Sequence, residues 1–152
     1  RGKSVVSANK ELIAKHAGEL FAAAGRGNAR LLFEGAVAGG IPILMPLKMS
    51  LAANRVQEVA GILNGTTNYI LTRMTEDGWD FKTALARAQE KGFAEADPTS
   101  DVEGYDASYK IAILAMLAYG QAVPLDRLAV EGISGLTPAD IANAKRLGYV
   151  IK

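Results

Sequence analysis

The sequence predicts an α+β protein: a strand–helix–strand unit over residues 1–40, then a mixed or antiparallel sheet over 41–152 with helices packed on one face. In the first forty residues, two short apolar runs flank a helical pattern, which is the order of a parallel unit. The remaining residues mix helical periodicity with short β-branched runs. A chain of 152 residues with 49% hydrophobic residues is long enough to bury a core.

The first part of the chain supplies one helix and two strands. Residues 3–8 form an apolar run that predicts a short strand. Asn9 is suited to cap a helix, which glycines 25 and 27 would end. Residues 29–33 predict a second buried strand. Residues 34–42 follow as a loop of small side chains, where backbone groups can approach a ligand.

The second part of the chain alternates strands and helices. Loose alternation over residues 55–63 predicts a half-exposed strand. Four helices are predicted: one capped by Thr66 or Thr67 and ending near Gly78, one from Asp80 to Gly92, the long apolar helix 106–119, and one beginning at Thr137-Pro138. Residues 128–133 and the segment that starts at Tyr149 are predicted to be strands.

Composition excludes several functional classes. A net charge of +1 argues against a nucleic-acid surface, which needs a basic excess on one face. The absence of cysteine removes disulfides, zinc-thiolate sites and cysteine nucleophiles, and it is typical of a reducing cytoplasm. The most apolar run, residues 111–119, is too short to span a bilayer, so no membrane partner is expected. Because the chain starts at Arg1 and ends in an incipient strand, we expect it to continue at both ends.

Residues 92–110 are the most unusual segment, with five carboxylates and a closing lysine. Asp106 and Lys110 are four residues apart, so they share one helical face. They could form an exposed ion pair, which stabilises a helix by roughly 0.2–0.5 kcal/mol. Alternatively, Lys110 lies at the mouth of a buried apolar helix and exchanges a proton with a substrate oxygen. Nearby carboxylates could then bind the ammonium group of an amino-acid substrate.

Two further segments have both a structural and a functional interpretation. The turn 64–69 resembles the start of a helix, where free backbone N–H groups bind anions, although a capped turn would use the same residues. Backbone carbonyls in the loop 34–41 could hold a hard cation, but the residues alone favour a tight structural loop. His16 is interpreted as a surface residue and Trp79 as a lid over the core.

The acidic segment also resembles a known family. From Ala88 to Lys110, the spacing of Gly92, Asp97-Pro98, Asp101, Gly104, Asp106 and Lys110 is similar to the signature of homoserine dehydrogenases. Segments 8–10, 34–42 and 64–71 match the same family in the same order. The resemblance implies interconversion of L-homoserine and L-aspartate 4-semialdehyde with NADP or NAD, in the cytoplasmic biosynthesis of threonine, methionine and isoleucine.

The same resemblance implies roles for individual residues. Lys110 matches the proton-transferring lysine and Asp106 the aspartate that supports hydride transfer. The substrate-binding positions correspond to Glu95, Asp101, Gly65, Thr66 and Lys10. The cofactor contacts correspond to Lys10, Gly92 and Ala8. The backbone carbonyls that hold a monovalent cation, usually sodium, correspond to Glu34, Val37, Gly39 and Ile41.

For domain organisation, the resemblance implies that residues 1–40 are the C-terminal remnant of a Rossmann domain. Residues 41–152 would be a substrate-binding and dimerisation domain, forming a homodimer through the sheet face. The 152 residues contain no Gly-rich phosphate loop, so we expect this polypeptide alone to be inactive. Two alternatives stay open: a non-catalytic dimerisation or ligand-binding module, and a piece of a bifunctional aspartokinase–homoserine dehydrogenase.

Overall fold

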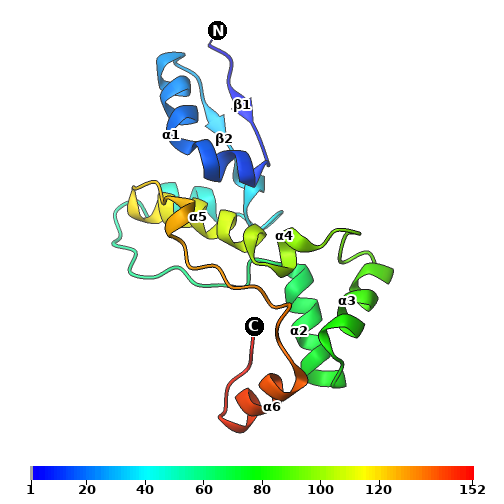
Figure 1. Ribbon diagram of the computed structural model, residues 1–152. Helices are drawn as coiled ribbons and strands as arrows, with labels where there is room; N and C mark the ends of the chain where they lie inside the picture. Colours follow the sequence, from blue (N-terminus) through cyan, green and yellow to red (C-terminus); the bar gives the residue numbers. More distant parts are fainter. Residues whose placement is uncertain (1) are drawn as a thin grey trace. The chain divides into compact units, whose positions relative to one another are not determined.

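The computed structural model describes residues 2–152, and the chain divides into two compact units (Figure 1). Unit 1 comprises the residues up to Leu63 together with Ala107–Ala129. Unit 2 comprises Asn64–Asp106 and Val130–Lys152. The division passes through helix α5 (Tyr105–Tyr119), whose first two residues belong to unit 2.

Unit 1 begins with the predicted strand–helix–strand. Strands β1 (Val5–Val6) and β2 (Leu31–Leu32) pair in parallel, with Val5 opposite Leu31, and helix α1 (Lys10–Arg26) connects them. Asn9 caps α1 as predicted, because its side chain accepts a 2.9 Å hydrogen bond from the Leu12 N–H. The helix ends at Gly27, whose N–H donates to the Ala23 carbonyl. The strands are shorter than predicted, but their order and direction are confirmed.

The core of unit 1 lies where α1, the segment after β2 and α5 meet. After β2, the chain forms the short 3₁₀ turn η1 (Glu34–Ala36) and the π-helical turn η2 (Pro46–Ser50), and a third turn, η3 (Leu125–Arg127), follows α5. The buried side chains of this core are Ile13, Phe33, Ala36, Val37, Leu44, Ile113 and Leu114. The predicted apolar helix 106–119 is therefore confirmed, with its central residues buried.

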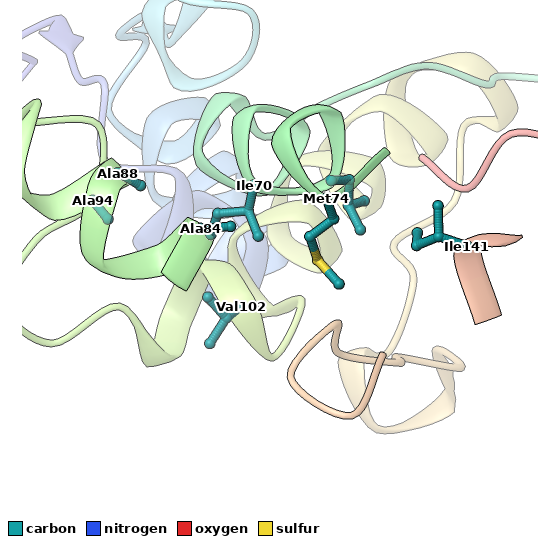
Figure 2. Close-up of a cluster of buried hydrophobic side chains, with 8 residues drawn as sticks. Ile70, Met74, Ala84, Ala88, Ala94, Val102 and Ile141 are labelled. Atoms are coloured by element: carbon teal, nitrogen blue, oxygen red, sulfur yellow. The ribbon is translucent and has the colours of Figure 1, made fainter. Parts of the chain in front are cut away.

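Unit 2 is a cluster of helices around a second core. Helix α3 (Phe81–Glu90) packs on α2 (Gly65–Asp77), which also contacts α4 (Thr99–Val102) and α6 (Pro138–Arg146). Figure 2 shows this core, to which the helices and the loop after α3 contribute Ile70, Leu71, Met74, Ala84, Ala88, Ala94, Val102 and Ile141. Trp79 packs against this cluster, as the prediction of a lid required.

Local signals located most helix starts in unit 2. Asp80 caps α3 by accepting from the Thr83 N–H at 2.8 Å, and Thr137 caps α6 in a reciprocal capping box with Asp140. The predicted cap of α2 was wrong. Asn64, not Thr66 or Thr67, caps this helix, because its side chain accepts the Thr67 N–H at 2.8 Å. The short helix α4 was not predicted.

The mixed or antiparallel sheet predicted for residues 41–152 is wrong in this chain. In the described part of the chain, residues 55–63, 128–133 and 149–152 form no strand. A strand forms only where a neighbouring strand satisfies its N–H and C=O groups in a ladder, and the described residues supply none for these segments. Some of their apolar side chains are exposed, Ile62 to 60% and Val130 to 40%, while others pack against the cores of the two units. The fold is helix-rich with one small parallel sheet.

Two smaller expectations concern the surface. His16 is exposed on α1 and lies 3.3 Å from a Glu19 oxygen, in agreement with its interpretation as a surface residue. Among residues 2–152, none of the helices is long and apolar enough to cross a membrane.

Candidate active site

The carboxylates of the acidic segment meet at the start of helix α2. Asn64, directly before α2, donates through Nδ2 to Asp101 Oδ1 at 2.7 Å and to Asp106 Oδ2 at 2.8 Å. Asp101 comes from α4 and Asp106 from the first turn of α5, so three elements of unit 2 converge on one amide. Asn64 is 7% exposed and Asp106 is 4% exposed. A carboxylate in such a place needs a donor, and Asn64 supplies one.

A second contact connects the start of α2 to the loop after α3. The hydroxyl of Thr66 donates to the Phe93 carbonyl oxygen at 2.7 Å. The loop begins at Gly92, whose φ of 74° favours glycine, and continues to Glu95. The Gln89 amide donates to the Glu95 carbonyl at 3.0 Å, so the loop is held from both sides. The Glu95 side chain stays exposed to solvent, where it can receive a ligand.

Not every carboxylate of the segment joins this cluster. Asp97 accepts hydrogen bonds from the Thr99 hydroxyl at 2.6 Å and the Thr99 N–H at 3.1 Å. These bonds stabilise the ionised carboxylate and hold the pKa of Asp97 below its ordinary value. Asp97 therefore shapes the turn that begins α4. Glu103 lies against the backbone near Gly132. Of the five carboxylates in residues 92–110, Asp101 and Asp106 are thus the two that bond to Asn64.

Lys110 lies one turn after Asp106 on α5 and is half-buried. Its Nζ donates to the backbone carbonyl oxygen of Leu63 at 2.7 Å, within unit 1. A backbone carbonyl carries no proton to exchange, so this bond orients the amine without consuming its acid–base capacity. The side-chain amine of Lys110 is consequently held in one place, unlike that of an exposed surface lysine.

The proposed cofactor residues of unit 1 follow strand β1. Ala8 follows β1 with only Ser7 between them, and Lys10 is the first residue of α1. Ligands of parallel α/β units bind outside the carboxyl ends of the strands, close to helix N-termini. Both carboxyl ends are crowded with small residues: a side chain on Gly35, after β2, would begin 3.4 Å from the Ala8 Cβ. The residues present therefore fit a nucleotide-type ligand.

The loop after β2 contains a side-chain anchor that the sequence did not reveal. The Glu34 carboxylate accepts three backbone N–H groups, from Ile43 at 2.7 Å, Leu44 at 2.9 Å and Met45 at 2.9 Å. Within the loop, Ala38 and Gly39 both have positive φ, 61° and 58°. Two successive left-handed residues turn the neighbouring peptide groups out of the usual direction. Among residues 2–152, side chains form no cluster of three His, Cys, Asp or Glu suited to a metal.

Comparison with known proteins decides the family. The family model described as homoserine dehydrogenase matches residues 42–152. The chain belongs to the homoserine dehydrogenase family. It is 54% identical over 150 residues to a homoserine dehydrogenase of Synechocystis, covering 99% of this chain and 35% of the relative. It is 55% identical over 152 residues to that of Mycobacterium tuberculosis, covering 100% of this chain and 34% of the relative.

Solved structures of homoserine dehydrogenases agree with this assignment. That of Thiobacillus denitrificans has a TM-score of 0.95 at 50% identity, covering 98% of this chain and 35% of that one. A hyperthermophilic archaeal homoserine dehydrogenase in complex with NADPH has a TM-score of 0.82 at 34% identity, covering 88% of this chain and 41% of that one. The chain thus spans about a third of the length of the curated homoserine dehydrogenases it matches.

The residues to which the family resemblance gives roles are distributed over both units. Unit 2 contains Gly65, Thr66, Gly92, Glu95, Asp101 and Asp106. Unit 1 contains Ala8, Lys10, Glu34, Val37, Gly39, Ile41 and Lys110. The bonds of Asn64 and Thr66 bring the members from unit 2 together on three elements. The sequence placed Asn64 in a turn that either begins an anion-binding helix or is merely capped. Its two bonds to carboxylates were missed, because both partners are distant in sequence.

Proposed function

We propose that the protein carrying this chain interconverts L-homoserine and L-aspartate 4-semialdehyde with NADP or NAD, in amino-acid biosynthesis in the cytoplasm. The proposal extends the family membership to a specific reaction, with residues 41–152 as the substrate-binding and dimerisation domain. The observation that carries it is the hydrogen bond of 2.7 Å that holds Lys110 Nζ at the Leu63 carbonyl oxygen.

Lys110 is the proton-transferring group of this proposal. In the reductive direction, its ammonium gives a proton to the aldehyde oxygen of the substrate while that oxygen gains negative charge. The C=O double bond becomes a C–O single bond, a new C–H and a new O–H bond form, and Lys110 is left as a neutral amine. In the oxidative direction, the neutral amine takes the hydroxyl proton of homoserine. The bound nicotinamide would supply or accept the hydride.

The substrate's amino-acid end needs carboxylates, and unit 2 offers them. Glu95 is exposed on the loop that Thr66 holds, and Asp101 lies in the cluster around Asn64. An α-ammonium group binds such carboxylates through charge-assisted hydrogen bonds. Gly65 and Thr66, with the free N–H groups of the α2 N-terminus, suit an oxygen of the substrate, and Lys10 suits its carboxylate. Asp106 would support hydride transfer from its buried position.

The cofactor half of the proposal rests on unit 1 and Gly92. Ala8 and Lys10 follow the carboxyl end of β1, where a dinucleotide would bind. Residues 1–40 would be the last part of a larger Rossmann domain. The exposure of Val6, 79%, supports this view, because parallel sheets normally have both faces covered. The carbonyls of Glu34, Val37, Gly39 and Ile41 would hold sodium, as the left-handed pair Ala38-Gly39 permits.

The same proposal includes a homodimer, but the subunits would meet through a different surface from the predicted sheet face. The sheet face expected to pair with a second subunit does not exist within this chain. Segment 55–63, which carries the exposed Ile62, is the surface proposed for this contact instead. A segment that forms no strand within its own chain can pair with a second chain by strand addition. Light scattering on the purified protein would test the dimer.

The function is tested with Lys110→Ala in the full-length protein. Removing the amine that accepts the hydroxyl proton should lower kcat for L-homoserine oxidation by about 10²–10⁴-fold. The midpoint of thermal unfolding should change little in comparison with this loss of turnover. A variant with undiminished turnover, or one that loses stability and turnover in parallel, would contradict the catalytic assignment and favour a structural role.

A further inference from the structure

The side chain of Asn64 joins two carboxylates through one amide group. Its Nδ2 donates to Asp101 Oδ1 at 2.7 Å and to Asp106 Oδ2 at 2.8 Å. A primary amide carries two N–H bonds, so each carboxylate can receive a hydrogen of its own. Asp101 and Asp106 are thereby held at a fixed spacing, although they belong to different helices.

The other end of the amide is fixed as well. The Asn64 Oδ1 accepts the Thr67 N–H at 2.8 Å and the Thr67 hydroxyl at 3.1 Å. Rotating the amide by half a turn would direct its oxygen at two carboxylates and its NH₂ group at an N–H donor. The hydrogen bonds to Asp101, to Asp106 and from the Thr67 N–H would then be lost, and only the Thr67 hydroxyl could adapt, by accepting instead of donating. The Asn64 side chain consequently has one orientation. Helix α2 fixes its oxygen, and this directs its NH₂ group at the two carboxylates.

Asparagine is the residue type that this position requires. Two carboxylates on one nitrogen repel each other through their like charges. A neutral double donor offsets this repulsion without adding charge. Aspartate would have no donor and would add a third negative charge. Serine would have one donor for two acceptors.

We propose that Asn64 is a positioning residue for the dehydrogenase reaction, which fixes Asp101 and Asp106 relative to each other. The inference rests on the proposed function, in which Asp101 binds the substrate and Asp106 supports hydride transfer. Asn64 itself touches neither substrate nor cofactor in this role. It acts through the two carboxylates, so its loss should alter substrate affinity and turnover together.

A purely structural role must be separated from this one, because Asn64 also caps α2. Aspartate caps helices as well as asparagine does. Asn64→Asp therefore keeps the cap and removes both donors, while Asn64→Ser keeps a cap and one donor. Asp80→Asn is the matched control. It makes the reverse exchange at the cap of α3, where the Asp80 side chain accepts the Thr83 N–H.

Steady-state kinetics of the full-length protein with L-homoserine and NADP measure the effect. Asn64→Asp should lower kcat/KM by about 10–10²-fold, because small misplacements of reacting groups have effects of this size. KM for homoserine should rise, Asn64→Ser should be intermediate, and Asp80→Asn should match the wild type. Partial unfolding would reduce the number of active molecules and leave KM unchanged. Unaltered KM and kcat in Asn64→Asp would overturn the proposal.

A crystal structure of Asn64→Asp gives a readout that needs no activity. We expect Asp101 or Asp106 to turn away from residue 64, with α2 intact. If both carboxylates keep their positions, Asn64 does not position them and the inference fails, whatever the kinetics. If the wild type does not oxidise homoserine, the proposed function fails instead, and the structure of the variant still decides whether Asn64 holds the two carboxylates.

Discussion

Gly132 lies against the backbone of Glu103 with no room for a side chain. A Cβ at position 132 would stand 2.6 Å from Glu103 Oε2, 2.8 Å from the Val102 carbonyl oxygen and 2.9 Å from Glu103 Cα. The contact is reinforced by the Ile133 N–H, which donates to the same Val102 oxygen at 2.8 Å. The turn between α4 and α5 is therefore packed directly on segment 130–133.

The close approach predicts that Gly132→Ala destabilises unit 2. Two of the three crowded atoms belong to backbone, so the chain itself must shift, and overpacking of this kind costs about 1–3 kcal/mol. The midpoint of thermal unfolding of the full-length protein should fall by several degrees, to be measured by calorimetry. Gly135→Ala is the control, because a Cβ there meets nothing within 4 Å. Equal midpoints for the two variants would refute the packing argument.

Glu34→Gln should destabilise unit 1. The carboxylate uses both oxygens to accept three backbone N–H groups, at 2.7, 2.9 and 2.9 Å. Glutamine has one oxygen, so its NH₂ group must face a backbone donor or turn away. A hydrogen bond to a charged group contributes about 1.5–3 kcal/mol. Urea denaturation should show a lower midpoint for this variant than for Glu19→Gln, which removes an exposed carboxylate on α1. Similar midpoints would mean that the three bonds contribute little.

Lys110→Arg separates charge from proton transfer. Arginine keeps a cation that can donate to the Leu63 carbonyl, but it does not release a proton at ordinary pH. We expect kcat for homoserine oxidation to fall by about 10²–10⁴-fold, with the thermal midpoint unchanged. Lys145→Arg, an exposed lysine in the last turn of α6, should retain full turnover. A fully active Lys110→Arg enzyme would mean that the site needs only a positive charge.

The elements that the sequence predicted correctly depend on local chemistry. Asn9, Asp80 and Thr137 each cap a helix by accepting an N–H from the same turn, so the signal and its effect lie within three residues. The parallel pair of β1 and β2 followed from the order of apolar runs on either side of one helix. No distant residue is needed for either inference.

The errors occurred where the outcome depends on distant partners. Residues 55–63 alternate as a strand does, but alternation describes only which face is buried and supplies no neighbouring strand. Likewise, Asn64 looked like an ordinary turn residue. Its carboxylate partners lie 37 and 42 residues further along the chain, so only the folded structure brings them to the amide. The family resemblance identified Asp101 and Asp106 but gave no reason for their spacing.

The capping box of α6 predicts a pH dependence of stability. The Asp140 carboxylate accepts the Thr137 hydroxyl at 2.6 Å and the Thr137 N–H at 2.9 Å. The hydroxyl, and then the N–H, hold the pKa of Asp140 below its ordinary value. A carboxyl with a lowered folded pKa contributes stability above its unfolded pKa, about 3.9. This contribution is lost as the pH falls through the folded pKa, because the unfolded state takes up its proton first.

Asp140→Asn tests this dependence, because the amide does not titrate in the same range. Urea midpoints of the wild type and Asp140→Asn should differ at about pH 7 and converge as the pH is lowered below about 4. Introducing Thr137→Ala into both proteins removes the hydroxyl that contributes most to the lowered pKa, so the pH-dependent part of the difference should shrink. If the difference in urea midpoint changes with pH by the same amount with and without the Thr137 hydroxyl, the effect comes from the charge of Asp140 in general. In that case, the capping box would not be its source.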